Sequence, residues 1–370
     1  MKYQFEDILQ KDTDGSWHWN LPQQFNIAEA CVDQHTGTLK ATQAALIIEN
    51  ETLGQSSVTY DELSCLTSQF ANVLASHGLE HGERILIRLP NSIEYPVSFF
   101  GAIKFGAIAV PTSTLLSASE VAYLAKDSGA KVLVTEKSMW SELSDELKDS
   151  QVTLVLLCGE GEIGKDGQFT LIDLTQALEK QDNAFECHQS GVNDPAYLVY
   201  TSGTTGYPKG VLHAQRALLG RLPASKFWFD LDDTTTERIM HSGKFNWTYV
   251  LGSALMDPLL HGHTVIAYEG KNDAHTWPTL IKKHECSIFI GVPTIYRQIV
   301  QKTDYDGSDL PSLKHCMSAG EHLSDEMQSV WKERFGRPIY EAIGMSEVSY
   351  YISQHKDAEV LPGAAGFVQP

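Results

Sequence analysis

Positive charge is scarce in this chain. Lysine and arginine together number 28 against 47 aspartates and glutamates, which gives a net charge of −19 over 370 residues. A protein whose main role is to bind nucleic acid normally presents a basic surface, so this balance argues against nucleic acid as a partner. Anionic ligands are not excluded, because they need only a local positive site.

Cysteine pairs and long apolar runs are also missing. The six cysteines are scattered with no C-x-x-C pair, which favours reduced thiols in a cytoplasmic protein over a disulfide framework or a zinc site. The amino-terminal residues are polar and lack the apolar core of a signal peptide. The most apolar stretch, residues 95–111, is broken by Lys104 and is too short to span a bilayer. We therefore expect a cytoplasmic protein without a transmembrane segment.

Two familiar nucleotide-binding patterns are absent as well. The Walker motif needs a Gly-Lys pair followed by serine or threonine, whereas Lys209 follows Pro208 and precedes Gly210. No G-x-G-x-x-G stands at a first β–α turn, where dinucleotide-binding enzymes carry it. A P-loop ATPase and a nicotinamide or flavin enzyme are both disfavoured.

The most informative stretch that is present is the loop from Thr201 to Gly210. It holds three glycines, four serine or threonine hydroxyls and one lysine, between an apolar run at 196–200 and a stretch from about His213 with a helical pattern. Glycine lets the backbone approach a ligand closely, hydroxyl and N–H groups donate to phosphate oxygens, and Lys209 adds a compact positive charge. The composition therefore predicts a polyanion site. The alternative, a flexible surface turn, does not need so many donors beside a lysine.

Strand-like and helix-like segments alternate along the chain. Capping-box patterns at Thr59–Glu62 and Ser117–Glu120 mark two helix starts, and Gly78 and Gly129 follow the corresponding helix ends. The predicted strands are 44–49, 84–89, 107–110, 131–135, 263–267, 287–291, 313–318 and 338–343, and the predicted helices are 59–78, 93–105, 117–129, 274–284, 293–301 and 324–335. Such alternation predicts an α/β fold with mostly parallel sheets flanked by helices.

The same pattern divides the chain into parts. Residues 1–40 are aromatic-rich and irregular, and we expect an arm packed on the main body. Residues 41–190 are expected to form a first α/β subdomain, of which 141–192 are more polar and less regular. Residues 191–360 are expected to form a second α/β subdomain with the nucleotide site, and residues 361–370 begin a further unit.

Five segments, in consistent order along the chain, resemble the adenylate-forming (AMP-binding) superfamily, which includes acyl-CoA synthetases, luciferases and peptide-synthetase adenylation domains. They are residues 104–111, 122–131, 200–211, 318–323 and 340–347. A finer similarity to the acetyl- and medium-chain acyl-CoA synthetases is carried by residues 25–33, 246–249 and 257–262. The resemblance runs from about residue 25 to 370 and implies the family's large amino-terminal adenylation domain, built from two α/β subdomains.

The family's chemistry consists of two half-reactions. The carboxylate of an acid attacks the α-phosphorus of ATP to give an acyl-adenylate and pyrophosphate, and a thiol, usually that of coenzyme A, then displaces AMP. The resemblance thus implies ATP, Mg²⁺, coenzyme A and a carboxylic acid as ligands. Because a carboxylate must approach a polyanion in line, catalysis would consist mainly of positioning and charge neutralisation.

The resemblance also implies roles for individual residues. Those implied to hold the β- and γ-phosphates are Thr201, Ser202, Gly203, Thr204, Thr205, Gly206 and Lys209. Those implied along the adenine and the α-phosphate are Gly320, Glu321, His322, Glu341, Ala342, Ile343, Gly344, Met345 and Ser346. Glu347 is implied as the Mg²⁺ ligand, a hard oxygen for a hard ion, although a solvated carboxylate at a strand end is the alternative for this residue. Lys209, Thr204 and Glu347 are the implied catalytic residues.

Two positions depart from the family's pattern. Ile343 stands where the family usually has an aromatic ring against adenine, so apolar contact is kept but stacking is lost. Gly344 stands where acetyl-specific relatives carry a tryptophan that closes the acyl pocket. The glycine predicts a substrate larger than acetate, either a medium-chain or an aryl acid. Trp247 lines that acyl pocket or packs in the core, and the sequence leaves both open.

The last residues, 361–370, resemble the start of the family's third subdomain, a small β-barrel. A ribose-binding aspartate, a hinge and a small carboxy-terminal domain with a catalytic lysine would follow, and none is in the sequence. We therefore expect a chain that binds nucleotide but is catalytically incomplete. The alternatives are a non-catalytic nucleotide- or acyl-binding fragment and an adenylation domain that loads a carrier protein. A homo-oligomer also stays open.

Three other groups of residues invite a functional interpretation. His261 and His263 are a metal pair or, as we favour, part of a turn before a strand. Cys286 and Cys316 lie in apolar strand contexts, which predicts core residues and not nucleophiles. The acidic run 230–233 is a cation site or a solvated turn, and the turn is favoured.

Overall fold

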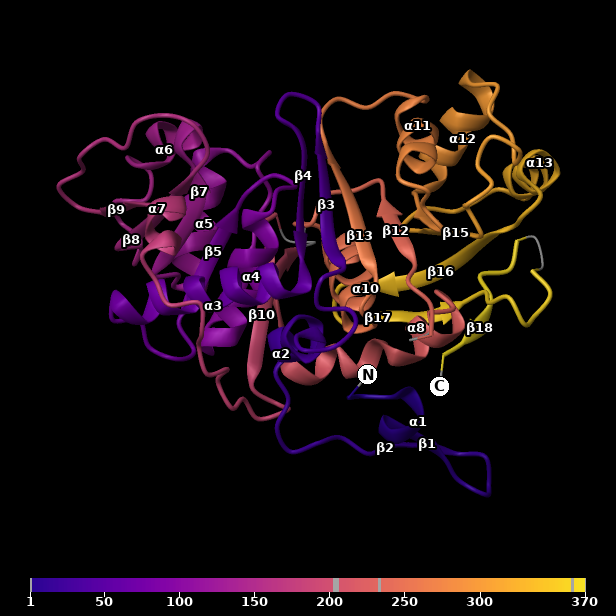
Figure 1. Ribbon diagram of the computed structural model, residues 1–370, viewed down its shortest axis with the longest axis horizontal. Helices are drawn as coiled ribbons and strands as arrows, with labels where there is room; N and C mark the ends of the chain where they lie inside the picture. Colours follow the sequence, from indigo (N-terminus) through magenta and orange to yellow (C-terminus); the bar gives the residue numbers. More distant parts are fainter. Residues whose placement is uncertain (1, 202–205, 232–233, 361–362, 370) are drawn as a thin grey trace.

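The computed structural model describes residues 2–201, 206–231, 234–360 and 363–369. Two lobes lie side by side, each built on a sheet covered by helices (Figure 1). The first lobe, drawn mostly in purple and magenta, holds a seven-stranded sheet, and the second lobe, drawn mostly in orange and yellow, holds a nine-stranded sheet. This arrangement confirms the predicted α/β class with mostly parallel sheets flanked by helices.

The seven-stranded sheet is parallel except at one edge, where β11 runs antiparallel to β10. Its strands, in spatial order, are β11 (Lys209–Ala214), β10 (Pro195–Thr201), β6 (Ile108–Pro111), β5 (Arg84–Arg88), β7 (Val132–Glu136), β8 (Leu154–Cys158) and β9 (Thr170–Asp173). Successive residues of a strand point to opposite faces, so Ile85 and Ile87 pack on one face and Leu86 on the other. The helices of this lobe are α3 (Tyr60–Ser76), α4 (Glu94–Phe105) and α7 (Leu174–Glu179) on the first face, and α5 (Ala118–Ser128) and α6 (Lys137–Leu143) on the second.

The nine-stranded sheet is antiparallel at both ends and parallel between them. Its strands, in spatial order, are β18 (Phe367–Val368), β17 (Ser349–Ser353), β16 (Ile339–Met345), β15 (His315–Ala319), β14 (Ile288–Ile290), β12 (Arg238–His241), β13 (Thr264–Glu269), β3 (Ala44–Asn50) and β4 (Gly54–Thr59). One face packs through Trp277, Tyr296 and Trp331; the helices that carry these residues are α11 (Thr276–Lys283), α12 (Pro293–Lys302) and α13 (Asp325–Phe335). The other face carries α8 (Leu222–Phe227), α9 (Thr248–Leu251) and α10 (Asp257–Leu260).

The two sheets do not follow the expected boundary at residue 190. β3 and β4, which precede it, complete the nine-stranded sheet, and β10 and β11, which follow it, complete the seven-stranded sheet. The chain thus passes from one sheet to the other after β4 and again after β11. The division into 41–190 and 191–360 stays a prediction about domains, but the two cores are interleaved along the chain.

The amino-terminal residues, expected as an irregular arm, contain short elements. These are α1 (Phe5–Ile8), β1 (Leu9–Lys11), β2 (Trp17–Trp19), α2 (Ile27–Cys31) and a 3₁₀ turn (Asp33–His35). β1 and β2 form an antiparallel hairpin at the bottom of the view in Figure 1. The Asn26 side chain caps α2 and also donates to the Ile103 carbonyl oxygen of α4 at 3.0 Å, which ties this segment to the first lobe.

The two predicted capping boxes are confirmed. Thr59 accepts a bond from the Glu62 N–H while the Glu62 carboxylate accepts from the Thr59 N–H at 2.7 Å, and Ser117 and Glu120 repeat the arrangement. Gly129 ends α5 in the left-handed conformation, with φ +62°. These helix ends are therefore determined by residues close together in the sequence.

The helix predicted from about His213 is wrong. Pairing with β10 keeps the chain extended to Ala214, and His213, which lies opposite Tyr197, stacks on its ring with 4.5 Å between centroids. Two 3₁₀ turns follow, Gln215–Ala217 and Leu219–Arg221, before α8 begins. The less regular stretch 141–192 also contains β8, whose five residues are all buried, and the strand β9.

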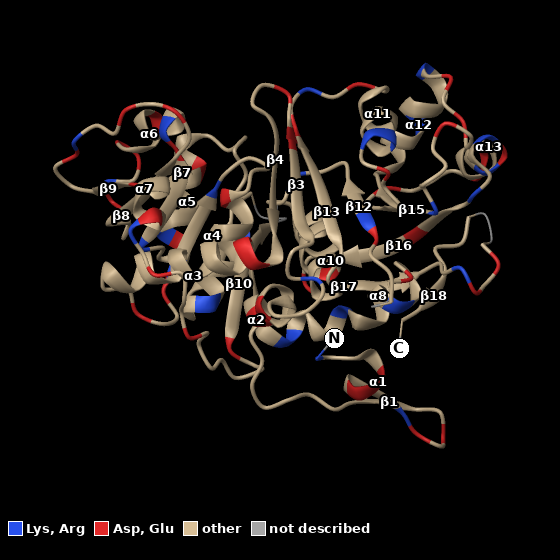
Figure 2. Ribbon diagram, viewed as in Figure 1, with Lys and Arg blue, Asp and Glu red and all other residues tan. Residues whose placement is uncertain are grey.

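Within the described ranges, no helix is both long enough and apolar enough to cross a membrane. Charged residues of both signs are interspersed over both lobes (Figure 2). The excess of negative charge is therefore not confined to one lobe, and the charges at the candidate site have to be judged one by one.

Candidate active site

The two predicted nucleotide motifs meet at the carboxyl ends of β15 and β16. These parallel strands pair with Ala319 opposite Ala342, so Gly320 and Ile343 continue from neighbouring positions at the same edge. Open α/β sheets bind their ligands beyond this edge. Gly320 turns the chain with a φ of +91°, a left-handed conformation that favours glycine.

A cavity of about 120 Å³ opens at this edge, and we call it the aromatic cavity. Its walls are formed by Arg221, Trp247, Thr248, Tyr249, Ala319, Gly320, Gly344, Met345, Ser346, Ser349 and Tyr350. Five residues predicted as nucleotide or acyl contacts thus surround one space, namely Trp247, Gly320, Gly344, Met345 and Ser346. Trp247 is 44 % exposed, so it borders this cavity and does not pack in the core.

Gly344 lies at an irregular step in the pairing of β16 with β17. Ile343 lies opposite Ile352, but Gly344 lies opposite Tyr350, so one residue of β17 is left over between the pairs. A Cβ on Gly344 would be 2.6 Å from the Ser349 carbonyl oxygen. The glycine therefore permits the close approach of the two strands as well as leaving the cavity open.

The loop from Thr201 to Gly210 that is predicted to hold phosphate, which we call the phosphate loop, is described only at its two ends. Thr201 ends β10 and pairs with Lys209 at the start of β11, so the loop closes a β-hairpin. Gly206 has a φ of +95°, and Lys209 is exposed. The predicted contacts Ser202, Gly203, Thr204 and Thr205 lie outside the described residues. Since a strand and not a helix follows, the loop cannot use a helix N-terminus to hold phosphate, as a P-loop does.

The stem of the phosphate loop rests on α5. Tyr207 stacks on Tyr123 with 5.3 Å between ring centroids, and the Tyr123 hydroxyl donates to the Pro208 carbonyl oxygen at 3.3 Å. On the other strand of the hairpin, the Tyr200 hydroxyl donates to Asp127 Oδ2 at 2.7 Å. Both sides of the stem are therefore held against the first lobe.

Ser346 and Glu347 form the turn between β16 and β17. Glu347 is exposed and borders a second cavity of about 290 Å³ together with His213 and Arg216. His213 lies on β11, the strand that begins at Lys209. The strand that carries the predicted phosphate-binding lysine thus runs beside the turn that carries the predicted metal ligand.

The surroundings of Glu347 suit a hydrated cation. Burial and the nearby Arg221 cation lower the pKa of His213 to about 4, against the opposing effects of the Ser346 backbone and the Glu347 carboxylate, so the imidazole is neutral near pH 7. No set of three or more His, Cys, Asp or Glu side chains among the described residues is placed to hold a metal. Mg²⁺ does not need such a set, because it keeps several waters and binds one or two carboxylates together with substrate phosphates. An exposed Glu347 fits this requirement.

Glu341 supports the loop predicted to line the adenine. Its carboxylate accepts from the Leu323 N–H at 3.0 Å, and its backbone N–H donates to the Gln354 side chain at 2.9 Å. Burial raises the pKa of the Glu341 carboxyl, although the Leu323 N–H opposes the change. Glu321, at the start of the loop, accepts from Thr294 Oγ1 at 3.0 Å. Both carboxylates therefore have partners within the protein.

The remaining predicted adenine contacts differ in exposure. Ile343 is 41 % exposed and His322 is also exposed, so both present surface to a ligand. Ala342 is 6 % exposed and packs in the core of the sheet, so it offers only its backbone.

A buried ion pair at the wall of the aromatic cavity was not expected from the sequence. Arg221 donates to Asp257 from Nε at 2.7 Å and from Nη2 at 2.5 Å, and both side chains are buried. Arg221 Nη1 donates to Ser349 Oγ at 2.8 Å, and the guanidinium lies 4.8 Å from the centre of the Tyr350 ring. Burial by itself would lower the pKa of Arg221, but Asp257 and Tyr350 raise it above its ordinary value, so the arginine stays charged.

The local backbone is shaped around this ion pair. α9 and α10 are joined by a π-helical turn, Gly252–Met256, a feature that often marks functional positions. A Cβ on Gly252 would overlap Arg221 Nη2, so a side chain at this position would displace the guanidinium. Ser349, which accepts from Arg221, has a φ of +59°, a strained value for a residue other than glycine.

Comparison with known proteins agrees with this geometry. The family model described as AMP-binding enzyme matches residues 36–370. The chain belongs to the AMP-binding enzymes. Among solved structures, this AMP-binding enzyme is similar to an anthranilate CoA ligase, AuaEII, in complex with anthranoyl-AMP, with a TM-score of 0.83 and 27 % identity; the match covers 95 % of this chain and 65 % of that chain.

Curated relatives of this AMP-binding enzyme include acid–CoA ligases. It is 30 % identical over 299 residues to the 3-hydroxybenzoate–CoA/4-hydroxybenzoate–CoA ligase of Thauera aromatica, which covers 80 % of this chain and 55 % of that protein. It is 26 % identical over 357 residues to the mitochondrial acyl-coenzyme A synthetase ACSM3 of Homo sapiens, which covers 95 % of this chain and 60 % of that protein. The chain thus spans less than two thirds of the length of these relatives.

The structure also describes two of the other groups that invited a functional interpretation, the histidine pair and the two cysteines in strand contexts. His261 and His263 flank Gly262 in the turn before β13, with 6.0 Å between their ring centroids, and belong to no metal-ligand set among the described residues. Cys286 and Cys316 are fully buried, and burial raises the pKa of each thiol to about 12, which disfavours the nucleophilic thiolate.

The acidic run 230–233 is described only at its start. Asp230 forms an ion pair with Lys356, so its carboxylate already has a cationic partner within the chain. Asp232 and Asp233 lie outside the described residues.

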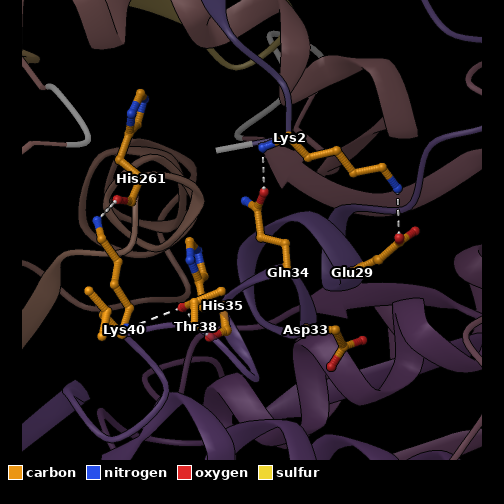
Figure 3. A pocket seen from close by; sticks show the side chains of 9 residues that line it. Lys2, Glu29, Asp33, Gln34, His35, Thr38, Lys40 and His261 are labelled. Carbon is orange, nitrogen blue, oxygen red and sulfur yellow. Dashed lines mark hydrogen bonds and ion pairs between the residues drawn. The ribbon is translucent and has the colours of Figure 1, made fainter.

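A further cavity of about 580 Å³ lies beside α2, and we call it the amino-terminal cavity (Figure 3). Its walls are formed by Lys2, Glu29, Asp33, Gln34, His35, Thr38, Leu39, Lys40 and His261. Figure 3 shows Lys40 reaching the His261 carbonyl oxygen, a bond of 2.6 Å. Because His261 precedes β13, this cavity lies toward the amino end of a parallel strand, whereas the aromatic cavity lies at the carboxyl ends. It is separate from the candidate active site of this AMP-binding enzyme.

Proposed function

We propose that this AMP-binding enzyme binds ATP with Mg²⁺ and a single-ring aromatic carboxylic acid. The carboxylate attacks the α-phosphorus to form an aryl-adenylate with release of pyrophosphate, and coenzyme A then takes the acyl group with release of AMP. The observation that carries the proposal is the aromatic cavity, which opens where the two nucleotide motifs meet and has Gly320 and Gly344 in its walls.

The size of the aromatic cavity supports a single ring. A dry protein cavity of about 150 Å³ is known to hold benzene, and the aromatic cavity is of that order, at about 120 Å³. Trp247, Tyr249 and Tyr350 offer aromatic faces and edges at its wall. An acyl chain with a similar number of carbons occupies a similar volume, so the aromatic wall, and not the volume, distinguishes the two classes. Of the two substrate classes left open by Gly344, the cavity therefore favours the aryl acid.

The names of related proteins support the same class. One relative is named for 3-hydroxybenzoate and 4-hydroxybenzoate, a second from Thauera aromatica is named for benzoate, and the similar solved structure holds anthranoyl-AMP. Each of these acids has one aromatic ring. ACSM3, a general acyl-coenzyme A synthetase by name, shares the ligase chemistry without naming a ring.

The charges near the aromatic cavity suit the first half-reaction. Lys209 is exposed at one end of the phosphate loop, and Glu347 is exposed on the turn beside β11. Bound Mg²⁺ would neutralise phosphate charge. Ser346 lines the cavity next to Glu347, which suits a hydroxyl that donates to the α-phosphate. Arg221 is already neutralised by Asp257, so it does not draw the substrate carboxylate away from phosphorus.

Equilibrium binding tests the proposal without requiring turnover. Isothermal titration calorimetry compares benzoyl-sulfamoyl-adenosine, a stable mimic of the aryl-adenylate, with its hexanoyl counterpart. We expect the benzoyl compound to bind at least about tenfold more tightly, and benzoate-dependent pyrophosphate release extends the test to the reaction. Tighter binding of the hexanoyl compound contradicts the aryl assignment, and failure of both to bind contradicts the adenylate-forming function.

Lys209→Met provides a control for the phosphate side of the site. The variant should weaken ATP binding by about tenfold, because it removes the compact charge beside the β- and γ-phosphates. Sulfamoyl-adenosines lack those phosphates, so their affinity should fall much less. An equal loss for both ligands would show that Lys209 supports the fold of the site and does not bind the phosphates.

A further inference from the structure

Tyr249 is distinctive among the described residues that line the aromatic cavity. Its hydroxyl is buried and makes no hydrogen bond. The carbonyl oxygen of the same residue, by contrast, accepts from Ser253 Oγ at 2.7 Å and from the Tyr350 hydroxyl at 3.3 Å. The fold therefore satisfies the main chain of Tyr249 and leaves its phenol without a partner, although buried tyrosine hydroxyls usually find one.

The Tyr249 ring is fixed by its neighbours. The centroids of three rings lie close to it at steep angles: His241 at 4.7 Å, Trp247 at 5.2 Å and Tyr350 at 5.9 Å. Packing thus fixes the position of the phenol oxygen, which a hydrogen bond helps to fix in most buried tyrosines. Tyr249 belongs to the wall of the aromatic cavity, and a polar group that packing already holds in place costs little further ordering when a ligand binds.

His241 places a second unpartnered group against the Tyr249 ring. Its Nδ1 accepts from the Gly243 N–H at 2.9 Å, which leaves the proton of the neutral ring on Nε2. Nε2 is buried and has no partner among the described residues. Burial lowers the pKa of His241 to about 3, so the ring is neutral near pH 7 and donates one bond from Nε2.

Each of the two groups suits a ligand hydroxyl. A phenol both donates and accepts, and this imidazole donates, so a ligand group that can accept and donate satisfies either of them. We propose that Tyr249, with His241 beside it, selects an aromatic acid that carries a hydroxyl on its ring; this inference rests on the function proposed above. A site built to bind a substrate hydroxyl rejects the analogue without it, because the buried protein groups then stay unpaired.

Calorimetry with four ligands tests the selection. These are benzoyl-sulfamoyl-adenosine and its 2-, 3- and 4-hydroxybenzoyl counterparts. At least one hydroxylated compound should bind the wild-type chain about tenfold or more tightly than the benzoyl compound. In Tyr249→Phe, the ratio of the affinity for that hydroxylated compound to the affinity for the benzoyl compound should fall to about two or less. The melting temperature of the free variant should not fall, because the deleted hydroxyl has no partner in the free protein; a hydroxyl with a structural role would lower it.

Tyr95→Phe is the matched control. Tyr95 is also buried with an unpartnered hydroxyl, but it lies on α4, outside the wall of the aromatic cavity. Its variant should keep the wild-type preference for the hydroxylated ligand. Equal binding of all four ligands by the wild type, or an unchanged preference in Tyr249→Phe, overturns the inference and leaves the proposed function standing. Failure of all four to bind overturns both.

Discussion

The aromatic cavity and the amino-terminal cavity are both bordered by polar side chains, but those side chains differ in what they already bond. In the amino-terminal cavity, Gln34 donates to the Leu260 carbonyl oxygen at 2.9 Å, and His35 donates to that of Leu259 at 2.7 Å. In the aromatic cavity, the Tyr249 hydroxyl has no partner. Gln34 and His35 thus join the 3₁₀ turn Asp33–His35 to α10, whereas Tyr249 keeps unused hydrogen-bonding capacity.

This difference shows that volume alone is a poor guide to a binding site. The amino-terminal cavity is the larger, at about 580 Å³ against about 120 Å³, yet Gln34, His35 and Lys40 in its wall hold neighbouring segments together. The smaller cavity lies beyond the carboxyl ends of parallel strands and has unused hydrogen-bonding capacity in its wall. Position in the fold and unsatisfied chemistry identify the site more securely than size.

The ion pairs of the two cavities also differ, in how deeply they are buried. The Arg221 and Asp257 side chains are 4 % and 0 % exposed, whereas those of Lys2 and Glu29 are 56 % and 34 % exposed. A buried pair depends on both partners, since either charge alone is poorly solvated. An exposed pair is compensated by water when one partner is lost. Mutations at the two ion pairs should therefore change the free energy of unfolding by different amounts, in addition to any difference in ligand binding.

We expect the largest effect from Arg221→Met. The change leaves the Asp257 carboxylate, which is 0 % exposed, without its counter-charge. Loss of one partner of a buried pair usually costs about 3–5 kcal/mol in the free energy of unfolding. Urea denaturation followed by tryptophan fluorescence measures this loss directly.

The double variant Arg221→Met/Asp257→Leu is the control for that experiment. It should regain most of the lost stability, because no uncompensated charge remains buried. A loss of less than about 1 kcal/mol in the single variant would place this pair in the range of exposed ones and remove the distinction between the two cavities.

Acid should lower the free energy of unfolding through two buried histidines, His213 and His241. Burial lowers the pKa of His213 to about 4 and that of His241 to about 3, from an ordinary value of 6.5. Above pH 6.5 both residues are neutral in the folded and unfolded states. Below it, the unfolded chain takes up protons first, so the free energy of unfolding falls by about 1.4 kcal/mol per pH unit for each histidine. The loss stops when the pH passes below the folded pKa.

Urea denaturation of the wild type and of His213→Gln at pH 7, 6 and 5 checks this expectation. The variant lacks one of the titrating groups, so its stability should fall less steeply between pH 6 and 5, by about 1.4 kcal/mol per pH unit. The same slope in both proteins would show that His213 is protonated as readily in the folded chain as in the unfolded one.

Gly320→Ala should produce a smaller loss, of about 1–2 kcal/mol, because Gly320 has a φ of +91° and a side chain disfavours that conformation. The added Cβ would meet Trp247 only at an ordinary contact distance of 3.5 Å, so the backbone determines the cost. Gly336→Ala, with φ +72° and open space around it, is the matched control away from the site. Denaturation should show similar losses for both variants, whereas only Gly320→Ala should weaken benzoyl-sulfamoyl-adenosine. Weakening by both would contradict the placement of the site.

The fold could be predicted from the sequence where its causes are local. Thr59 and Ser117 each cap a helix through a residue three positions later, so a short window of sequence contains the whole interaction. β8 was missed for a related reason. Its residues Leu154–Cys158 are all buried, and a short continuous apolar run shows no periodicity that distinguishes a strand from a helix.

Prediction failed where the conformation or contacts of a segment depend on residues far away in the sequence. The residues from Lys209 to Ala214 pair with β10 across the phosphate loop, and this pairing overrides the helical pattern around His213. Arg221 binds Asp257 and Ser349, which are 36 and 128 residues away, so no local pattern connects them. Resemblance to a family located the glycines of the cavity, but the unpartnered Tyr249 hydroxyl becomes visible only when the folded neighbours are known.

The smallest effect is expected from Glu29→Gln, at the exposed ion pair of the amino-terminal cavity. The change removes a 2.9 Å contact with Lys2, whose side chain is 56 % exposed and can be solvated by water instead. Exposed pairs of this kind contribute little, so we expect a change within about 0.5 kcal/mol in urea denaturation and unaltered calorimetric affinity for benzoyl-sulfamoyl-adenosine. Glutamine keeps the shape of the side chain, so any larger effect would come from the charge itself. A loss above about 2 kcal/mol, beyond the usual range of exposed pairs, or a marked loss of affinity would show that the amino-terminal cavity is coupled to the site. In that case, the fact that its polar groups already have partners would not distinguish the amino-terminal cavity from the aromatic cavity.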